Sequence, residues 1–540
     1  MRARQSGPLV QAGDFFGEGC AGTLLGPHAG VMPICWPSLD ATRRTADLES
    51  VTRTGVDVLV VGGGVTGAGI ALDAASRGLR VALVERGDLA QGTSRWSSKL
   101  VHGGLRYLAR GELGLARDSA RERAILMTRT APHLIRPLPF LIPSTAGRTA
   151  IVLGRLGTGG GDLFRLGLPG GIGSLPRARW VGQSRARQLV PGLRSEARGG
   201  VVFWDGQLID DARLVVGLAR TAATYGASVL TRVEASSLGA DGAELIDRMT
   251  PGASLSVEAR VVINATGVWA GELANGVSLR PSQGSHLVVG SGLLGNPRAA
   301  LTVPLPGPTS RYVFALPQLD GRTYIGLTDE PVEGRIGEED PRPAAAEIDV
   351  LLATINTALA RSLRPEDIGG AFAGLRPLGA GPASSGSADL SRRHLISRDS
   401  AGVLTITGGK LTTYRAMAEE VVDLVTSALG APARCRTRRL PLVGAAGRER
   451  LAAIDAAPWL VARYGAEAER VVAEGGPYGA ERVAPGLPVT VAELRYAVRH
   501  ELALTVDDLL DRRTRIGLVP HDRFAALPVA EQVLAELNRS

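Results

Sequence analysis

Two short stretches hold the residue types best able to do chemistry. The first, "SRWSSKLVHGGLRYL" at residues 94–108, sets Lys99 and His102 among serines and glycines and has Arg106 near its end. The second, "GGKLTTYR", contains Lys410. These are the only two lysines among 61 basic residues. A lysine is a compact charge whose pKa can shift, unlike an arginine, so we predict that both are functional rather than survivors of drift toward arginine.

A glycine-rich turn next to the first stretch predicts a dinucleotide site. The run "DVLVV" at residues 57–61 has the pattern of a buried strand, and a helix and a second strand ending at Glu85 follow it. Between them, Gly62, Gly64 and Gly67 give the spacing GxGxxG. Such glycines let the backbone approach a pyrophosphate at a helix N-terminus, while the acid accepts hydrogen bonds from ribose hydroxyls.

The second stretch repeats the order of strand, glycine turn and helix. Gly409, Lys410 and Thr412 fall at the N-terminus of the helix expected from "TTYRAMAEEVVDLV". Backbone amides and the helix dipole favour negative charge there. A threonine N-cap explains Thr412 without a ligand, but it does not explain the lysine beside it.

Composition limits the classes of function. A chain of 540 residues should hold two or three domains. Its net charge of +8 is compatible with nucleic acid, an anionic membrane surface or an acidic substrate, but no lysine-rich run or aromatic ladder favours nucleic acid. Three widely spaced cysteines without a CxxC pair predict neither disulfides nor a metal site, which suits the cytoplasm. No apolar run is long enough to span a membrane.

The elements that must position these residues fall into three parts. Residues 1–54 are expected to be a disordered extension or a mis-assigned start, with Met32 as one later start. Residues 138–176 are expected to be an irregular excursion. The remaining segments are nucleotide-binding segments at 55–137, 196–275 and 370–430, an antiparallel substrate or cap sheet at 276–369, and a C-terminal helical domain at 431–540, so that the redox region as a whole spans 55–430.

Several motifs in order resemble one family. The similar motifs are the glycine-rich turn at residues 62–67, which we name the fingerprint turn, then "SSKLVHGGLRYL", "DDARL", "NATGVWA", "GSHLVV", "GLRPL", "GGKLTTYR" and the tail "RYAVRHELALTVDDLLDRRTR". Through them the chain resembles the aerobic-type FAD-dependent glycerol-3-phosphate dehydrogenases. The resemblance runs from about Asp57 to the C-terminus. It implies an α/β fold with a Rossmann-like FAD-binding domain of the glutathione-reductase or amino-acid-oxidase type, an antiparallel substrate domain and a C-terminal α-helical domain.

The resemblance also implies site residues. The substrate-binding set is Arg106, Tyr107, Arg376 and Lys410, because arginines and a lysine suit a phosphate dianion. The catalytic set is His286, His102 and Arg376, and a neutral histidine suits removal of an alcohol proton. His286 is slightly favoured over His102 as the base. The FAD-binding set is Gly62, Gly64, Gly67, Glu85, Thr93, Ser94, Ser98, Lys99, Ala265, Gly267, Gly409, Lys410, Leu411 and Thr412.

The implied activity is oxidation of sn-glycerol 3-phosphate to dihydroxyacetone phosphate, with hydride passing to flavin N5 and electrons to membrane quinone. The implied location is the inner face of the cell membrane, where a basic, peripherally bound protein meets anionic lipid. A homodimer is one option for assembly. The alternatives are a glycerol-3-phosphate oxidase that makes hydrogen peroxide, an amine or 2-hydroxy acid oxidase, and a flavin protein that binds nucleic acid. Trp96 is bulky where members of the family carry small or polar residues, which predicts altered contacts at the flavin edge.

Overall fold

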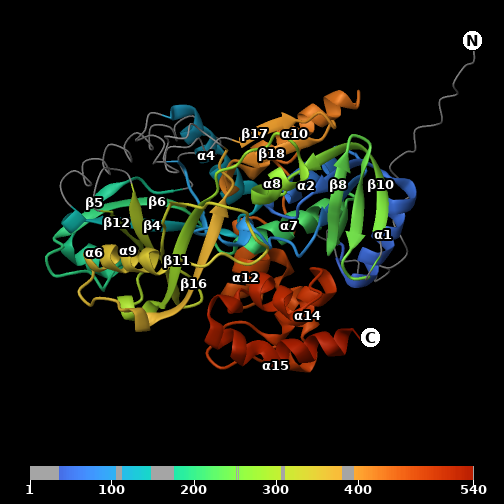
Figure 1. Ribbon diagram of the computed structural model, residues 1–540. Coiled ribbons are helices and arrows are strands. Elements are labelled where there is room, and N and C mark those ends of the chain that lie inside the picture. Colours follow the sequence, from blue (N-terminus) through green and yellow to red (C-terminus); the bar gives the residue numbers. More distant parts are fainter. Residues whose placement is uncertain are drawn as a thin grey trace, which may run out of the picture. The chain divides into compact units, whose positions relative to one another are not determined.

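Two sheets and a group of C-terminal helices make up the protein (Figure 1). The computed structural model describes residues 36–104, 112–146, 175–250, 252, 254–305, 311–379 and 394–538.

The first sheet forms around the predicted βαβ unit. Its strands run in the order β17-β18-β10-β1-β2-β7, and the four pairs from β18 to β7 are parallel. An antiparallel meander of β8, β9 and β10 extends it. The bounds are β1 Val56–Val61, β2 Val81–Glu85, β7 Ser228–Thr231, β8 Val233–Gly239, β9 Gly242–Asp247, β10 Ser254–Asn264, β17 His394–Arg398 and β18 Leu404–Gly408.

Helix α2 (Val65–Ser76) packs against both α7 (Asp211–Thr224) and α10 (Tyr414–Ala428) beside this sheet. Their buried side chains share one hydrophobic cluster with Val58 and Val60 of β1. The predicted strand, glycine turn, helix and strand are therefore confirmed, and the N-termini of α2 and α10 both point toward the site described below.

The expectation that residues 1–54 form a disordered extension is wrong for residues 41–54, which are helical. Helix α1 spans Ala41–Thr54 and begins at an Asp40 cap, whose carboxylate accepts a hydrogen bond from the Arg43 amide at 2.8 Å. The Arg44 side chain is buried and donates to the Thr231 carbonyl at 2.7 Å and to Asp247 at 2.5 Å. The helix has few apolar residues, so its hydrophobic pattern is weak. Residues 1–35, which include Met32, lie outside the described residues.

The second sheet has the order β15-β11-β14-β13-β12-β4-β6-β3, with β16 added on β11 and β5 on β6. It is antiparallel as predicted, apart from one parallel pair between β12 and β4. Helices α6 (Gln183–Leu189) and α9 (Ala345–Asn356) contribute to the core on one face. The strands are β3 Leu100–Val101, β4 Ile135–Pro143, β5 Arg179–Gly182, β6 Gly199–Leu208, β11 Ser282–Gly290, β12 Ala300–Pro304, β13 Tyr312–Pro317, β14 Arg322–Gly326, β15 Glu330–Pro331 and β16 Ile368–Arg376.

Two predicted boundaries are wrong here. Strands β6 and β16 belong to the second sheet, although we assigned their residues to the nucleotide-binding segments 196–275 and 370–430. Residues 138–143 lie in β4 and are not irregular. The prolines at positions 137, 139 and 143 suggested a break, but they alternate along the strand and so share one edge, while β6 pairs along the whole of β4. The rest of the Gly-rich excursion, residues 147–174, lies outside the described residues.

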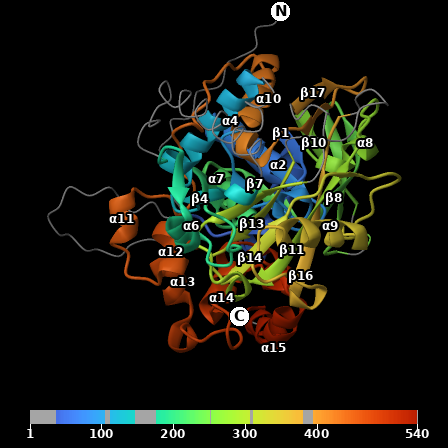
Figure 2. The same cartoon turned by 90° about the vertical axis from the view of Figure 1, so that its left-hand side faces the viewer.

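The C-terminal part is helical, as predicted. Figures 1 and 2 show its helices gathered on one side of the two sheets. The predicted amphipathic stretch divides into α14 and a π-helical turn, η12, with Leu502 between them in a left-handed conformation at φ 55°. The bounds are α11 Arg448–Ala452, α12 Pro458–Tyr464, α13 Ala468–Glu474, α14 Val491–His500, η12 Asp508–Arg513 and α15 Pro520–Leu537. Among the described residues, no helix is long and apolar enough to cross a membrane.

Candidate functional site

A cavity of about 660 Å³ opens where loops of the first sheet meet the second sheet. This size falls within the range typical of ligand pockets. Its walls come from the turn after β1, the segment after β2, strands β4, β6 and β13, and the start of α10. Most of the predicted site residues line it, namely Gly62, Gly64, Glu85, Thr93, Ser94, Ser98, His102, Ala265, Gly267, Arg376, Gly409, Lys410, Leu411 and Thr412.

The fingerprint turn has the shape of a pyrophosphate cradle. A Cβ on Gly67 would lie 1.9 Å from the Gly62 carbonyl oxygen, and Gly62 itself has φ 114°. Neither position tolerates a side chain, because the backbone of one element touches that of the next. Gly64 caps α2 without a side chain, and the Ser94 hydroxyl accepts a hydrogen bond from the Val65 amide at 2.9 Å. The helix N-terminus therefore faces the cavity, and this arrangement fits the diphosphate of a bound dinucleotide.

Glu85 lies at the end of β2, where the predicted ribose contact should be. Its carboxylate accepts hydrogen bonds from the Gly63 amide at 2.7 Å and the Gly87 amide at 2.8 Å. Burial raises the pKa of this carboxyl group. Glu85 thus fastens the fingerprint turn to the loop that follows β2, in addition to lining the cavity.

Lys99 supports the wall of the cavity from behind. Its side chain is 0% exposed, does not line the cavity, and donates to Asp211 at 2.7 Å and to the Arg95 carbonyl at 2.5 Å. The same Asp211 oxygen accepts hydrogen bonds from the amide and hydroxyl of Ser97. Burial lowers the pKa of Lys99 to about 8. The "SSKL" segment is therefore fixed to the start of α7 through "DDARL".

The two candidate histidines occupy different environments. His102 follows β3 directly and lines the cavity. His286 is 0% exposed and does not line it, and its Nε2 lies 2.9 Å from the Ser98 hydroxyl. Its ring stacks on Phe372 at 4.7 Å. Burial, with the positive charges of Lys99 and Arg376, holds the pKa of His286 well below its usual range, so this ring is neutral.

Two of the predicted cations reach the same cavity. Arg376 is held by hydrogen bonds from Nη1 to the Ser282 hydroxyl at 3.0 Å and to Asp329 at 2.9 Å, and from Nη2 to the Thr328 carbonyl at 3.0 Å. Lys410 precedes the short helix Leu411–Thr413 at the start of α10, and its ammonium donates to the Ser119 hydroxyl at 3.4 Å. Arg106 and Tyr107 lie outside the described residues.

An aspartate that sequence reasoning missed holds the His102 segment. The Asp205 carboxylate accepts the Gly103 amide at 3.0 Å and the Arg123 guanidinium at 2.7 Å, and all three groups are buried. Arg123 comes from α4 (Leu113–Ile125), a helix that a π-helical turn, η2 (Leu126–Thr130), continues. A carboxylate inside the apolar strand "VVFWDGQLI" was the available signal.

Trp96 lines the cavity, and its ring stacks on Phe372 and against the Arg95 guanidinium. Its ring lies 5.6 Å from that of Phe372, and the Arg95 guanidinium lies 4.0 Å above it. The indole N–H donates to Asp340 at 3.3 Å, and Arg95 pairs with the same carboxylate. Trp96 therefore joins the segment after β2 to β16 and to the linker that contains Asp340.

Comparisons with known proteins identify the family of the chain. Residues 57–424 match the family model described as FAD dependent oxidoreductase, and residues 435–539 match the C-terminal domain of alpha-glycerophosphate oxidase. Glycerol-3-phosphate dehydrogenase 1 of Mycobacterium tuberculosis (strain ATCC 25618 / H37Rv) is 50% identical over 524 residues, covering 95% of this chain and 100% of the relative. Glycerol-3-phosphate dehydrogenase of Mycobacterium leprae is 38% identical, covering 93% of this chain and 88% of the relative.

A solved structure shares the fold over nearly the whole chain. The X-ray structure of the glycerol-3-phosphate dehydrogenase from Bacillus halodurans complexed with FAD superposes with a TM-score of 0.70 at 29% identity, covering 92% of this chain and 94% of that one. The cavity, the fingerprint turn and these matches define the class as FAD-dependent oxidoreductases. Within it, the chain belongs to the FAD-dependent glycerol-3-phosphate dehydrogenase family.

Proposed function

We propose that this protein oxidises sn-glycerol 3-phosphate to dihydroxyacetone phosphate and passes the electrons to membrane quinone. The observation that carries the proposal is that Arg376, Lys410 and His102 line one cavity together with the fingerprint turn. Two cations meet the charge of a phosphate, and a histidine stands close enough to the same space to serve as a base. The names of the relatives support this substrate.

Arg376 and Lys410 hold the phosphate in this mechanism. The guanidinium is fixed by several chain acceptors, so it keeps its orientation and can offer a planar contact. Lys410 adds a point charge at a helix N-terminus, where backbone amides also favour an anion. Arg106 and Tyr107 remain proposed partners of the same substrate. Together these groups set which end of the alcohol faces the flavin.

His102 removes the hydroxyl proton of the substrate. When bound, FAD would supply the acceptor for the hydride that leaves the carbon carrying the hydroxyl group. The histidine must then hold the proton near that oxygen, and the hydrogen bond from Gly103 to Asp205 fixes the backbone next to it. His286 lies behind Ser98 and orients that hydroxyl at the cavity wall, so we assign it a positioning role and prefer His102 as the base.

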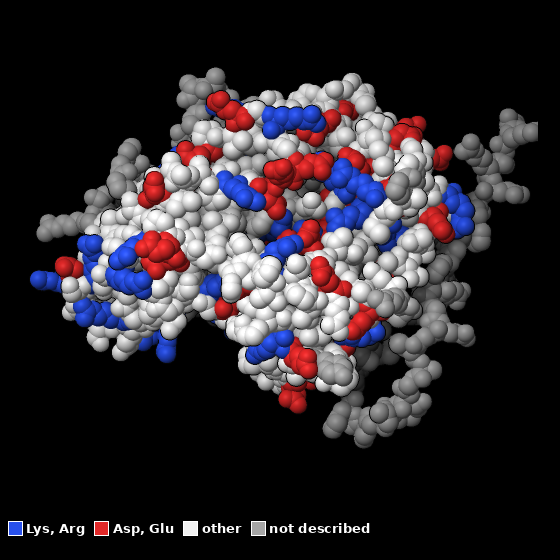
Figure 3. Space-filling view, turned by 60° about the horizontal axis from the view of Figure 1, so that its bottom comes forward, with Lys and Arg blue, Asp and Glu red and all other residues white. Residues whose placement is uncertain are grey.

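The acceptor and the location form the finer part of the proposal. A net charge of +8 supports peripheral binding to anionic lipid at the inner face of the membrane. On the face drawn in Figure 3, basic and acidic groups are interspersed, which is unlike the single-sign patch expected of a nucleic-acid binder. Oxygen is the second candidate acceptor, because the C-terminal region matches a model named for an oxidase. A homodimer is a further proposal.

Steady-state oxidation of sn-glycerol 3-phosphate tests the proposal. The purified protein would be assayed in parallel with a quinone analogue and with dissolved oxygen. Fast quinone reduction with little peroxide is the expected result. Peroxide as the main product would make the protein an oxidase. Failure of the substrate to bleach the flavin under either condition would overturn the substrate assignment.

A further inference from the structure

The loop after β2 is fastened to the fingerprint turn on its inner side. The Ala90 amide donates to the Gly63 carbonyl at 3.0 Å, and Glu85 accepts the Gly63 and Gly87 amides. The loop itself is closed by the Gln91 side chain, which accepts the Asp88 amide at 2.9 Å. A displacement of this loop would therefore displace the turn that receives the cofactor.

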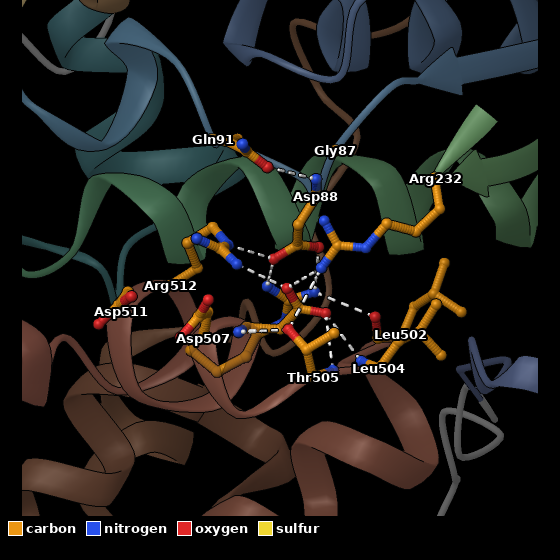
Figure 4. Close-up of polar contacts among 12 residues, drawn as sticks. Gly87, Asp88, Gln91, Arg232, Leu502, Leu504, Thr505, Asp507, Asp511 and Arg512 are labelled. Carbon is orange, nitrogen blue, oxygen red and sulfur yellow. Dashed lines mark hydrogen bonds and ion pairs between the residues drawn. The ribbon is translucent and has the colours of Figure 1, made fainter. Parts of the chain in front are cut away.

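On its outer side the same loop is held by two arginines of the C-terminal helices (Figure 4). The Asp88 carboxylate, 0% exposed, accepts a hydrogen bond from Arg512 Nε at 2.7 Å. It also accepts Arg513 Nη1 at 2.7 Å and Arg513 Nη2 at 2.9 Å. These two charges keep the pKa of Asp88 well below its usual range.

The two arginines are fixed by their own domain. Arg513, 0% exposed, donates from Nη2 to the Glu501 carbonyl at 2.8 Å. Arg512 donates to Asp508 at 2.6 Å, and Asp508 also accepts Arg232 at 2.5 Å. Guanidinium groups with several fixed acceptors lose little further freedom when they bind one more carboxylate. They are therefore rigid supports for Asp88.

Docking of the C-terminal helices does not depend on this contact alone. Arg220 on α7 pairs with Glu467 at 2.6 and 2.9 Å, and Arg213 pairs with Glu501 at 2.8 Å for both bonds. Both pairs are buried, and neither involves the loop after β2. The Asp88 contact differs from them because it reaches the cofactor side of the first sheet.

We propose that the C-terminal helical domain sets the FAD affinity of this protein: Arg512 and Arg513 act through Asp88 as positioning residues for the loop and glycine turn that hold the adenosine and diphosphate of FAD. The proposal rests on the FAD-dependent class of the chain and is independent of which alcohol is oxidised. It gives the tail signature "DDLLDRRTR" a role in cofactor binding.

The test compares two identical substitutions at matched buried pairs. Arg513→Lys shortens the side chain and removes its paired hydrogen bonds to Asp88. Arg220→Lys makes the same change at Glu467, away from the loop. FAD would be removed from each full-length protein, and its dissociation constant measured by flavin fluorescence on titration. We expect Arg513→Lys to weaken FAD binding about 10- to 100-fold, the range by which metal binding weakens when the residues that orient metal ligands are changed. Arg220→Lys should stay within about threefold, a shift well below the tenfold that 1.4 kcal/mol gives.

Thermal unfolding of the apoproteins separates positioning from general stability. Both variants should lose stability without FAD, because each weakens a buried pair. At saturating FAD, Arg513→Lys should regain kcat, with an unchanged KM for the alcohol, whereas a distorted substrate site would shift KM. If Arg513→Lys does not fold, Asp88→Asn and Arg512→Lys carry the same test. Unchanged FAD affinity in the Asp88 and Arg513 variants, or an equal loss in Arg220→Lys, would overturn the proposal.

Discussion

Replacing each candidate histidine by asparagine distinguishes the base from a supporting group. A positioned general base contributes about 10²–10⁴ to a rate, so His102→Asn should lower the rate of flavin reduction by at least about 100-fold. His286→Asn should lower it by less than about tenfold, because the His286 ring is 0% exposed, does not line the cavity and reaches it only through Ser98.

The assay is anaerobic single-turnover reduction of the bound flavin by sn-glycerol 3-phosphate, followed by loss of flavin absorbance. It reports the step before any external acceptor acts, so the choice between quinone and oxygen does not affect it. FAD content and thermal unfolding of each variant correct for loss of cofactor or fold. A loss of 100-fold or more in His286→Asn, with His102→Asn near the unsubstituted rate, would refute the assignment.

The pH profile gives a second criterion. Since the pKa of His286 is held well below its usual range, a reaction that needs neutral His286 would lose rate only at strongly acidic pH. An acidic limb of the pH profile that persists in His286→Asn and disappears in His102→Asn would support His102. The opposite pattern would return the role of base to His286.

Three further predictions concern ionisable side chains of the described residues. His133 is buried with a pKa lowered to about 3, so below pH 6.5 the unfolded chain takes up a proton that the folded chain does not, and the free energy of unfolding falls. Between pH 7 and pH 5 this group alone should lower the free energy of unfolding by about 2 kcal/mol. Denaturant titration of His133→Gln should show a loss that is smaller by the same amount. Lys99→Met leaves Asp211 buried without its cation and should lower the free energy of unfolding in denaturant by about 3–5 kcal/mol, whereas a change under 1 kcal/mol would contradict the pairing. Arg376→Lys keeps the charge but loses the planar contact, so KM for the phosphate substrate should rise about tenfold or more with FAD content unchanged; an unchanged KM would remove Arg376 from the phosphate site.

Local patterns in the sequence were sufficient where one segment builds the whole feature. The strand, the glycines and Glu85 lie within 30 residues, and the backbone approach of Gly67 to Gly62 allows only glycine. The same holds for the start of α10, where glycines, a lysine and a helix follow in order. Hydrophobic periodicity also indicated the C-terminal helices, because their cores are mostly their own.

Pairing between segments that are distant in the sequence could not be predicted from local patterns. Strand β6 is followed by α7 of the nucleotide-binding part, yet its ladder is with β4, about 60 residues earlier. Helix α1 is held by a hydrogen bond from Arg44 to Asp247, a partner some 200 residues away in the sequence. Its sequence has no clear apolar stripe that would predict a packed helix. Asp205, Arg123 and Asp88 have their roles only after distant segments meet.

The two lysines persist for different physical reasons. At position 99 the side chain ends in a closed space between Asp211 and the Arg95 carbonyl. A guanidinium brings five N–H donors, and those without acceptors in such a site would each cost free energy, so an arginine is excluded there by hydrogen bonding and not by charge. Lys410 lies on the cavity wall, and its ammonium group donates to the Ser119 hydroxyl. Lys410 therefore lines the cavity and Lys99 supports the wall behind it, although their rarity made the two lysines look alike in the sequence.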